Sequence, residues 1–403
     1  MAVKNKLMPF ILGILLIVTY FVSILGYSTR RTLLIIMLLA LLLSPFRGDK
    51  KIRIQFAEFI WIFTLLIVAV SMISSQVNPF YLLFYATMIA FLLIADSNTS
   101  WMSAAMNVGI MMGIVYAFFT IVQVVAGDFY LARLYPLLQY NSTFDAARYM
   151  RFGIYSGLTY QTAVNALYLS IGIGSTFCSL LYKKAGRVWK VMVITIEMIC
   201  IMLSAKRGHL LFVALSLLIV AYYSSNKGKR IRNILILGIL LFSIYIIAYY
   251  RIPAVSYFFD RLSDTSGDIS NGRFTLYVSA VEQFKQHPIF GIGWEQFRST
   301  YIRYIDVHNI YLQLLCETGL VGTMIFFTAF IGTLMYTIKK INSIVSGRVI
   351  SREKCLLLFA LFCQVFFLLY GFTGNALYDY YVLSVYFIGV VISFKCPLKG
   401  AAQ

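Results

Sequence analysis

Long apolar runs separated by short polar segments dominate the chain. Twelve runs can be marked, and most approach the length of about 20 residues that a helix needs to cross a bilayer. The pattern predicts an all-α, polytopic membrane protein with about twelve transmembrane helices, in a single membrane domain over residues 1–403. The runs lie near residues 7–26, 32–46, 56–74, 79–95, 101–126, 157–182, 188–204, 208–224, 233–252, 309–338, 355–371 and 382–395.

The composition agrees with this pattern. Of the 403 residues, 61% are hydrophobic and 12% are charged. Soluble proteins are about half apolar and about a quarter charged. These values exclude a soluble enzyme, a disordered chain and a fibrous protein. The six cysteines form no C-x-x-C pair, so we expect neither a disulfide framework nor a zinc site.

The net charge of +19 arises from 34 Lys and Arg against 15 Asp and Glu. In a membrane protein such an excess collects in cytoplasmic loops, so we expect no nucleic-acid partner. With the N-terminus inside, 21 of the 34 basic residues fall in inner segments. The distribution predicts both termini in the cytoplasm. The first run follows two lysines but has no small-residue cleavage site, so we expect it to be retained.

Two segments on the predicted outer side are long, near 127–156 and 253–308. Within the second, the apolar spacing of Arg273–Gln286 predicts an amphipathic helix that ends at His287-Pro288. A long loop with its own helix is usually functional in a compact protein. We therefore expect the main outer loop to carry functional residues.

Several cations lie on this predicted outer side, where topology disfavours positive charge. Lys206 and Arg207 stand between two apolar runs with almost no loop. They could bind the phosphates of a lipid carrier or extend to the phosphates of the surrounding lipids. Arg273, Arg148 and Arg151 have the same two interpretations. Charge alone does not separate them.

A second candidate is the stretch His308-Asn309-(x9)-Gly319-x-x-Gly322 at the start of the tenth run. A histidine can take up a proton near neutral pH. Asn309 suits a helix N-cap, and the two glycines would allow close approach of a neighbouring helix. The alternative is a capped helix with a surface histidine. Trp294 could stack on a sugar or anchor the chain at the interface.

Acidic residues within or near the apolar runs give weaker signals. Glu197, near the middle of the seventh run, could relay protons or be a structural residue inside the bundle. Glu317 lies about half a helical turn away from His308 in facing, so we expect no direct pairing. Asp260, Asp264 and Asp268 stand among Ser, Thr and Gly, which favours a solvated loop over a metal site.

The combined motifs resemble the O-antigen ligase and polymerase superfamily of bacterial membrane glycosyltransferases. The long outer loop before the last three runs fits that family, as does Arg151-x-Gly153 in the earlier outer loop. The motifs that carry the resemblance are Leu203-Ser204-Ala205-Lys206-Arg207-Gly208, then Gly272-Arg273-Phe274 with Pro288-Ile289-Phe290-Gly291-Ile292-Gly293, and then His308-Asn309-(x9)-Gly319-x-x-Gly322.

The resemblance implies an inverting, metal-independent transfer without a cofactor. A glycan on undecaprenyl diphosphate moves to an acceptor hydroxyl at the outer face of the bacterial inner membrane. His308 would be the base, and Arg207 with Arg273 would stabilise the departing diphosphate. Lys206, Arg151, Arg148, Trp294 and Asn309 are further candidates for substrate binding.

The resemblance leaves the acceptor open. A polymerase adds the glycan to another lipid-linked repeat unit of O-antigen, capsule or exopolysaccharide, and a ligase adds it to lipid A-core. Arg261-(x10)-Gly272 has the spacing of one polymerase arginine motif, but the companion Arg-(x15)-Gly spacing starts at none of Arg133, Arg148 or Arg151. His308 also lacks the second nearby histidine of some ligases, and we favour polymerisation. A chain-length regulator is then a candidate partner. A lipid-linked oligosaccharide transporter is the alternative from a different class, and it would need access from both faces.

Overall fold

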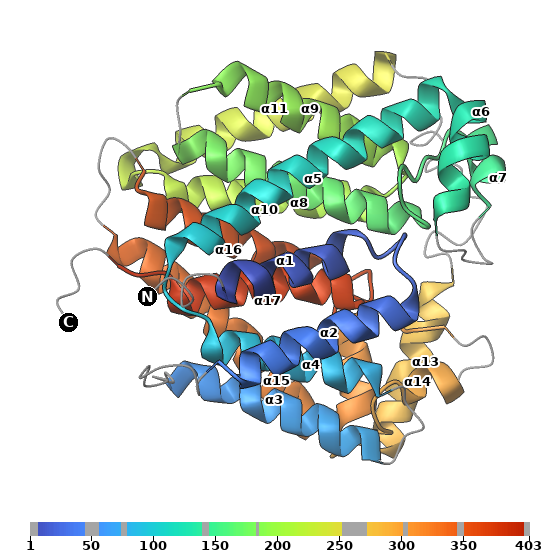
Figure 1. Cartoon of the computed structure of the whole chain (residues 1–403), viewed down its shortest axis with the longest axis vertical. Coiled ribbons are helices and arrows are strands. Elements are labelled where there is room, and N and C mark those ends of the chain that lie inside the picture. Colours follow the sequence, from blue (N-terminus) through green and yellow to red (C-terminus); the bar gives the residue numbers. More distant parts are fainter. Residues whose placement is uncertain are drawn as a thin grey trace.

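The computed structural model describes residues 7–44, 56–73, 79–138, 145–182, 185–251, 272–300, 305–344 and 350–398. Within these ranges every regular element is helical, so the predicted all-α class is confirmed (Figure 1). Each of the twelve apolar runs overlaps one labelled helix. These helices are α1 (Leu7–Tyr20), α2 (Tyr27–Leu42), α3 (Phe56–Ile73), α4 (Phe80–Ile94), α5 (Thr99–Val125), α8 (Thr162–Tyr182), α9 (Arg187–Leu203), α10 (Arg207–Ser224), α11 (Arg230–Arg251), α15 (Ile310–Ser343), α16 (Arg352–Tyr370) and α17 (Tyr380–Lys395).

Shorter helices occupy the segments between them. The predicted helix over Arg273–Gln286 is confirmed by α13, which has the same bounds. Residues 252–271, which belong to the predicted main outer loop and include Arg261 and the three aspartates considered above, lie outside the described residues. The remaining short elements are α6 (Gly127–Phe129), η2 (Tyr130–Leu134), η3 (Tyr135–Leu137), α7 (Ala146–Arg151), η4 (Lys227–Lys229) and α14 (Gln296–Thr300).

Six of the described helices, α5, α8, α10, α11, α15 and α16, are long and apolar enough to cross a membrane. Helices α1, α4 and α17 are apolar but shorter. A total of about twelve spans therefore stays a prediction.

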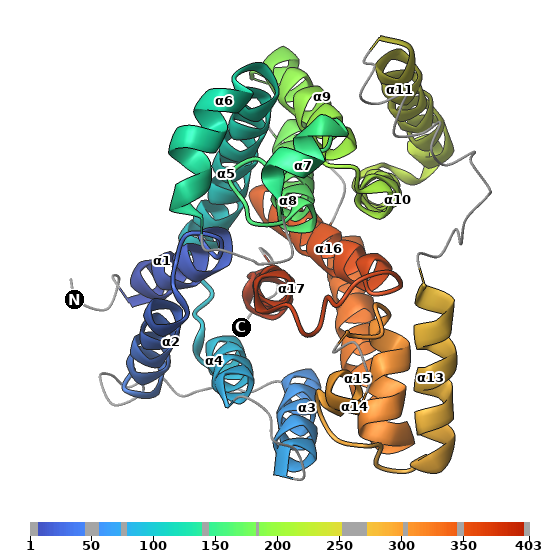
Figure 2. The same ribbon diagram turned by 90° about the vertical axis from the view of Figure 1, so that its right-hand side faces the viewer.

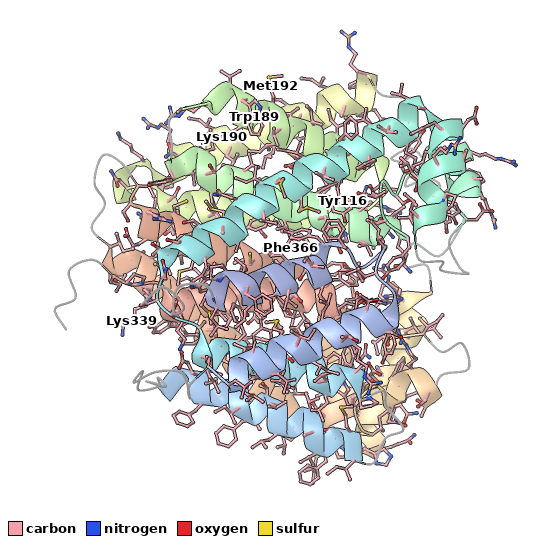
Figure 3. All side chains as sticks on the ribbon, in the orientation of Figure 1. Tyr116, Trp189, Lys190, Met192, Lys339 and Phe366 are labelled. Atoms are coloured by element: carbon pink, nitrogen blue, oxygen red, sulfur yellow. The ribbon has the colours of Figure 1, made fainter. Side chains whose placement is uncertain are left out.

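Burial divides the helices into central and peripheral ones. Almost every side chain of α8, α16 and α17 is buried. Helix α11 lies at the periphery against α10 (Figure 2). Large apolar side chains point outward from the flanks, among them Trp189 and Met192 on α9 (Figure 3). Such flanks suit contact with lipid.

The two ends of the bundle differ in character. At one end, where α1 begins and α17 ends, Lys395 pairs with Glu58 at 2.7 Å. Arg352 donates to Ser103 at the same end, and Lys339 lies at its edge (Figure 3). Helices α6, α7, α13 and α14 lie at the opposite end (Figure 1).

Helix α15 is two helices joined at Gly319, which has φ 63° and ψ −166°. The predicted single helix over 309–338 is therefore wrong in this respect. At the kink, some backbone N–H and C=O groups have no hydrogen-bond partner within the helix. Residues 288–293 supply the missing partners. Leu320 N donates to Pro288 O at 2.9 Å, and Gly293 N donates to Glu317 O at 2.9 Å.

The two glycine motifs meet at this kink. A Cβ on Gly319 would lie 2.3 Å from the Ile289 carbonyl oxygen, and one on Gly291 would lie 2.3 Å from the Glu317 carbonyl carbon. Gly319 thus admits a loop rather than the helix that we expected. Gly322 does face a neighbouring helix, because its Cβ would lie 3.0 Å from Ile67 of α3.

We expect Gly319→Ala to lower the unfolding temperature in detergent. The new methyl group would meet backbone atoms, and the positive φ would add strain, for a cost of about 1–3 kcal/mol. Gly332→Ala in the same helix is the matched control, since nothing lies within 4 Å of its Cβ position. Equal unfolding temperatures for the two variants would contradict this account of the kink.

Candidate active site

A cavity of about 930 Å³ opens at the end of the bundle that carries α13. It collects residues from five separate parts of the chain: the start of α8, the α9–α10 turn, α13, the approach to α15, and the α16–α17 connection. Four of the residues predicted from sequence line it, namely Lys206, Arg207, Arg273 and His308. Their roles in catalysis remain proposals.

The α9–α10 turn presents two cations to the cavity. It reverses the chain at Ala205, whose φ of 55° is uncommon for a residue with a side chain. Asn165 donates to Ser204 Oγ at 3.0 Å, which fixes the end of α9. Burial, together with the charge of Arg273, lowers the pKa of Lys206. The turn therefore holds positive charge close to the start of α13.

His308 also lines the cavity. Its backbone has a positive φ of 57°, as Ala205 has in the α9–α10 turn. The predicted cap at Asn309 is confirmed, because its side chain accepts from Tyr311 N at 3.0 Å and Leu312 N at 3.1 Å. Ile310 N donates to Gly371 O at 2.9 Å, which docks the start of α15 on the end of α16. Backbone strain of this kind often accompanies functional positions.

The charges around His308 determine how it ionises. Burial lowers the pKa of His308, and the positive charges of Arg273, Lys206 and Arg298 act in the same direction. Only Asp306 opposes them. The imidazole therefore stays neutral, and able to accept a proton, at pH values where an ordinary histidine would be charged.

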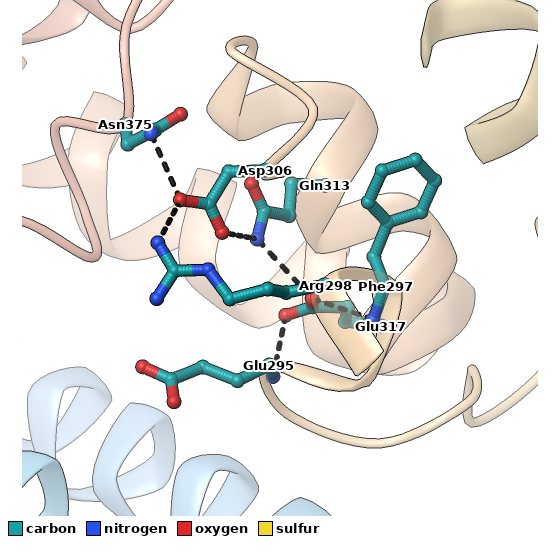
Figure 4. Close-up of polar contacts among 7 residues, drawn as sticks. All are labelled: Glu295, Phe297, Arg298, Asp306, Gln313, Glu317 and Asn375. Atoms are coloured by element: carbon teal, nitrogen blue, oxygen red, sulfur yellow. Dashed lines mark hydrogen bonds and ion pairs between the residues drawn. The ribbon is translucent and has the colours of Figure 1, made fainter. Parts of the chain in front are cut away.

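Asp306 organises the wall beside His308 (Figure 4). Its carboxylate accepts from Arg298 Nη2 at 2.5 Å, from Asn375 Nδ2 at 3.0 Å and from Gln313 Nε2 at 3.5 Å. Arg298 and Asn375 line the same cavity. This network joins the segment before α15 to the α16–α17 connection.

Asp379, at the end of that connection, also lines the cavity. Burial and the nearby Asp306 raise the pKa of Asp379 to about 7, while Arg298 and a hydrogen bond from Tyr381 oppose the rise. The cavity thus has a cationic wall with Lys206, Arg207 and Arg273, and two carboxylates, of which Asp306 acts on both His308 and Asp379. Sequence reasoning missed Asp306 and Asp379, because single acids in short polar connections give no distinctive pattern.

Glu317 is fully buried directly behind this site. As expected, it does not pair with His308. Its carboxylate accepts from Glu295 N at 2.9 Å, Phe297 N at 3.2 Å and Gln313 Nε2 at 3.2 Å (Figure 4). It also accepts from the Tyr378 hydroxyl. Through Gln313 it adjoins the Asp306 network. Glu317 therefore anchors the loop that carries Arg298.

The other predicted substrate-binding residues lie elsewhere. Trp294 is 0% exposed, its ring centroid lies 4.7 Å from that of Tyr378, and it is not among the residues that line the cavity, so its role in substrate binding stays a prediction. Asn309 uses its side-chain oxygen as the cap. Arg148 and Arg151 are exposed on α7 and are not among the residues that line the cavity.

Glu197 is separate from the cavity as well. Its carboxylate lies between α5 and α8, where a Cβ on Gly113 would be 2.2 Å from Oε1 and one on Gly172 would be 2.6 Å away. Neither oxygen has a hydrogen-bond partner within the described part of the chain. This position fits the structural interpretation better than a relay to the cavity.

Comparison with known proteins adds one match. Residues 191–327 match the family model described as O-Antigen ligase. The matched segment includes the α9–α10 turn, α13, His308 and the Gly319 kink. No curated protein matches the chain.

Proposed function

We propose that this chain, whose residues 191–327 match the O-antigen ligase family model, is a glycosyltransferase of the O-antigen ligase and polymerase superfamily that transfers a glycan from undecaprenyl diphosphate to an acceptor hydroxyl. One observation carries the proposal: Lys206, Arg207, Arg273 and His308, from three separate segments, line one cavity. A fixed cationic wall next to a neutral base is what such a displacement requires.

The proposed step begins with the acceptor hydroxyl beside His308. Its oxygen attacks the anomeric carbon as its proton passes to the imidazole. The bond from the anomeric carbon to the diphosphate oxygen breaks, and the diphosphate leaves with the electron pair. Arg273, Arg207 and Lys206 stabilise the charge that develops there. Attack on the face opposite the leaving group inverts the anomeric centre.

The carboxylate wall suits the acceptor. Asp379 and the Oδ1 atom of Asn375 offer oxygens that accept hydrogen bonds from sugar hydroxyls, and the negative charges of Asp306 and Asp379 would repel a diphosphate. The donor then lies toward Arg273 and the acceptor toward Asp379. Such a division gives the two substrates distinct places in one cavity.

We infer that the acceptor is a second lipid-linked repeat unit, so that the reaction lengthens a polysaccharide. Ligation to lipid A-core is the second candidate, because the matching family model is described as a ligase. Purified protein in nanodiscs would receive the lipid-linked oligosaccharide as the only substrate. A ladder of longer products supports polymerisation. Transfer only after lipid A-core is added supports ligation.

The transporter alternative would need a path to both faces. The cavity-lining residues gather at the α13 end. At the other end Lys395 pairs with Glu58, and Arg352 donates to Ser103. This one-sided position favours an enzyme. We propose that the cavity faces outward from the bacterial inner membrane, with both termini in the cytoplasm.

The lowered pKa of His308 predicts how the rate of glycan transfer depends on pH. A base acts only when unprotonated, so kcat/KM should fall as the pH drops through the pKa of His308. Since burial and Arg273 lower that pKa, we expect this acid limb below pH 6.5. The Asp379→Asn variant should show the same acid limb at the same pH. A limb near pH 7 that disappears in Asp379→Asn would instead assign the base to Asp379.

A further inference from the structure

A buried group of polar side chains lies directly behind the α9–α10 turn, which presents Lys206 and Arg207 to the cavity. It forms where the ends of α5 and α9 meet the start of α8, three helices that pack side by side (Figure 2). Thr120, Asn165 and Ser204 come from these three helices, and each is 0% exposed. They are not among the residues that line the cavity, so they do not contact a ligand bound there.

The side-chain amide of Asn165 joins the other two residues. Its Nδ2 atom donates to Thr120 Oγ1 at 2.9 Å and to Ser204 Oγ at 3.0 Å. The Thr120 hydroxyl itself donates to Tyr116 O at 2.7 Å. The Ser204 hydroxyl donates to Cys200 O at 3.0 Å. Because both hydroxyl hydrogens are used in this way, the two oxygens act as acceptors, and only a side chain with two donors joins them.

The segment that leads into α8, residues 155–161, packs against the same polar group. Tyr155 N donates to Leu203 O at 3.0 Å, next to the turn. Gly157 approaches so closely that a Cβ atom on it would lie 2.9 Å from Asn165 Oδ1. The last two residues of the segment line the cavity. The turn and this part of the cavity wall are therefore held by one set of contacts.

We propose that Asn165 is a positioning residue, which holds the α9–α10 turn so that Lys206 and Arg207 point at the diphosphate of the donor. The inference rests on the proposed function and gives a role in it to a residue that touches no substrate. Ser204 immediately precedes Ala205, where the chain reverses. A shift of Ser204 would therefore redirect both cations, and a displacement of about 1 Å can cost about 100-fold in rate.

Binding of undecaprenyl diphosphate to the full-length protein in nanodiscs tests this role without knowledge of the sugar. We expect Asn165→Ala to weaken binding about tenfold, because the cations of the turn lose their alignment. In a protein that also carries Lys206→Gln and Arg207→Gln, the turn has no cations left to position. In that background Asn165→Ala should change the affinity less than about twofold, since an effect exerted through the turn does not add.

Ser170→Ala is the matched control, because it removes another buried polar group from α8. Ser170 is 0% exposed, and its hydroxyl donates to Ala166 O at 2.6 Å within the helix. The control should bind undecaprenyl diphosphate as the wild type does. Unfolding temperatures in detergent verify that each variant folds. If Asn165→Ala does not fold, Ser204→Ala removes one acceptor of the amide and takes its place, with and without the two cations of the turn.

A tenfold loss that persists without the two cations, or an equal loss in Ser170→Ala, would overturn the positioning role and leave the enzyme proposal intact. Wild-type affinity in a folded Asn165→Ala protein would do the same. A wild-type protein that does not bind undecaprenyl diphosphate would instead contradict the proposed function, and the role of Asn165 would fail with it.

Discussion

His308→Ala is expected to lower the rate of glycan transfer by about 10²- to 10⁴-fold, the usual contribution of a general base. The acceptor hydroxyl would lose the group that takes its proton, while Lys206, Arg207 and Arg273 would still bind the donor. The change should therefore appear mainly in kcat. Measurement of initial rates at several donor concentrations separates this from weaker binding.

His287→Ala is the control for this experiment. His287 is exposed at the end of α13 and is not among the cavity-lining residues. Its variant should retain the wild-type rate. Unfolding temperatures of both variants verify that they fold. Full transfer activity in a folded His308→Ala protein would remove His308 from the mechanism.

Arg273→Gln is expected to have the second large effect, a loss of about 10²- to 10³-fold in kcat/KM. The guanidinium would stabilise the departing diphosphate, whose negative charge grows as the bond to the sugar breaks. Glutamine keeps much of the length of the side chain but removes its charge. Arg273→Lys should recover only part of the activity, because an ammonium group lacks the planar pair of donors.

The same substitution should also move the acid limb of the pH profile. Arg273 contributes to the low pKa of His308, so its removal should shift the limb to higher pH. Arg133→Gln, at an exposed arginine of the α6–α7 region, should change neither rate nor profile. An unshifted limb in Arg273→Gln would show that Arg273 and His308 do not act in one site.

Much of the fold followed from apolar periodicity, because lipid and a packed bundle both require long apolar helices. The amphipathic helix at Arg273–Gln286 was predicted with its exact bounds, since Gly272 and Pro288 mark its ends. The cap at Asn309 was also predicted, because its short polar side chain suits that position. Local chemistry is sufficient to specify features of this kind.

The kink at Gly319 was missed for a physical reason. Apolar residues stand on both sides of the short stretch Glu317-Thr318-Gly319, so the apolar run continues across it. The break depends on residues 288–293, whose backbone groups satisfy those that the kink exposes. No local pattern reveals a partner that lies so far away in the sequence.

The candidate site was predicted in part. Lys206, Arg207, Arg273 and His308 were chosen separately, and the fold brings them to one cavity. Arg148 and Arg151 looked equivalent in sequence, yet both are exposed on α7 and are not among the residues that line the cavity. The charge of a side chain does not indicate which way the helix that carries it will face. The sequence does not single out Asp379, because its raised pKa depends on burial and on Asp306, which belongs to another segment of the chain.

The most direct test of the central claim measures release of undecaprenyl diphosphate from its glycan-bearing form by the purified protein, with and without a chelator. The account predicts release by the wild type that is coupled to glycan transfer, that is unaffected by the chelator, and that is lost in His308→Ala and Arg273→Gln. Movement of the intact donor across the bilayer without release of undecaprenyl diphosphate would contradict it.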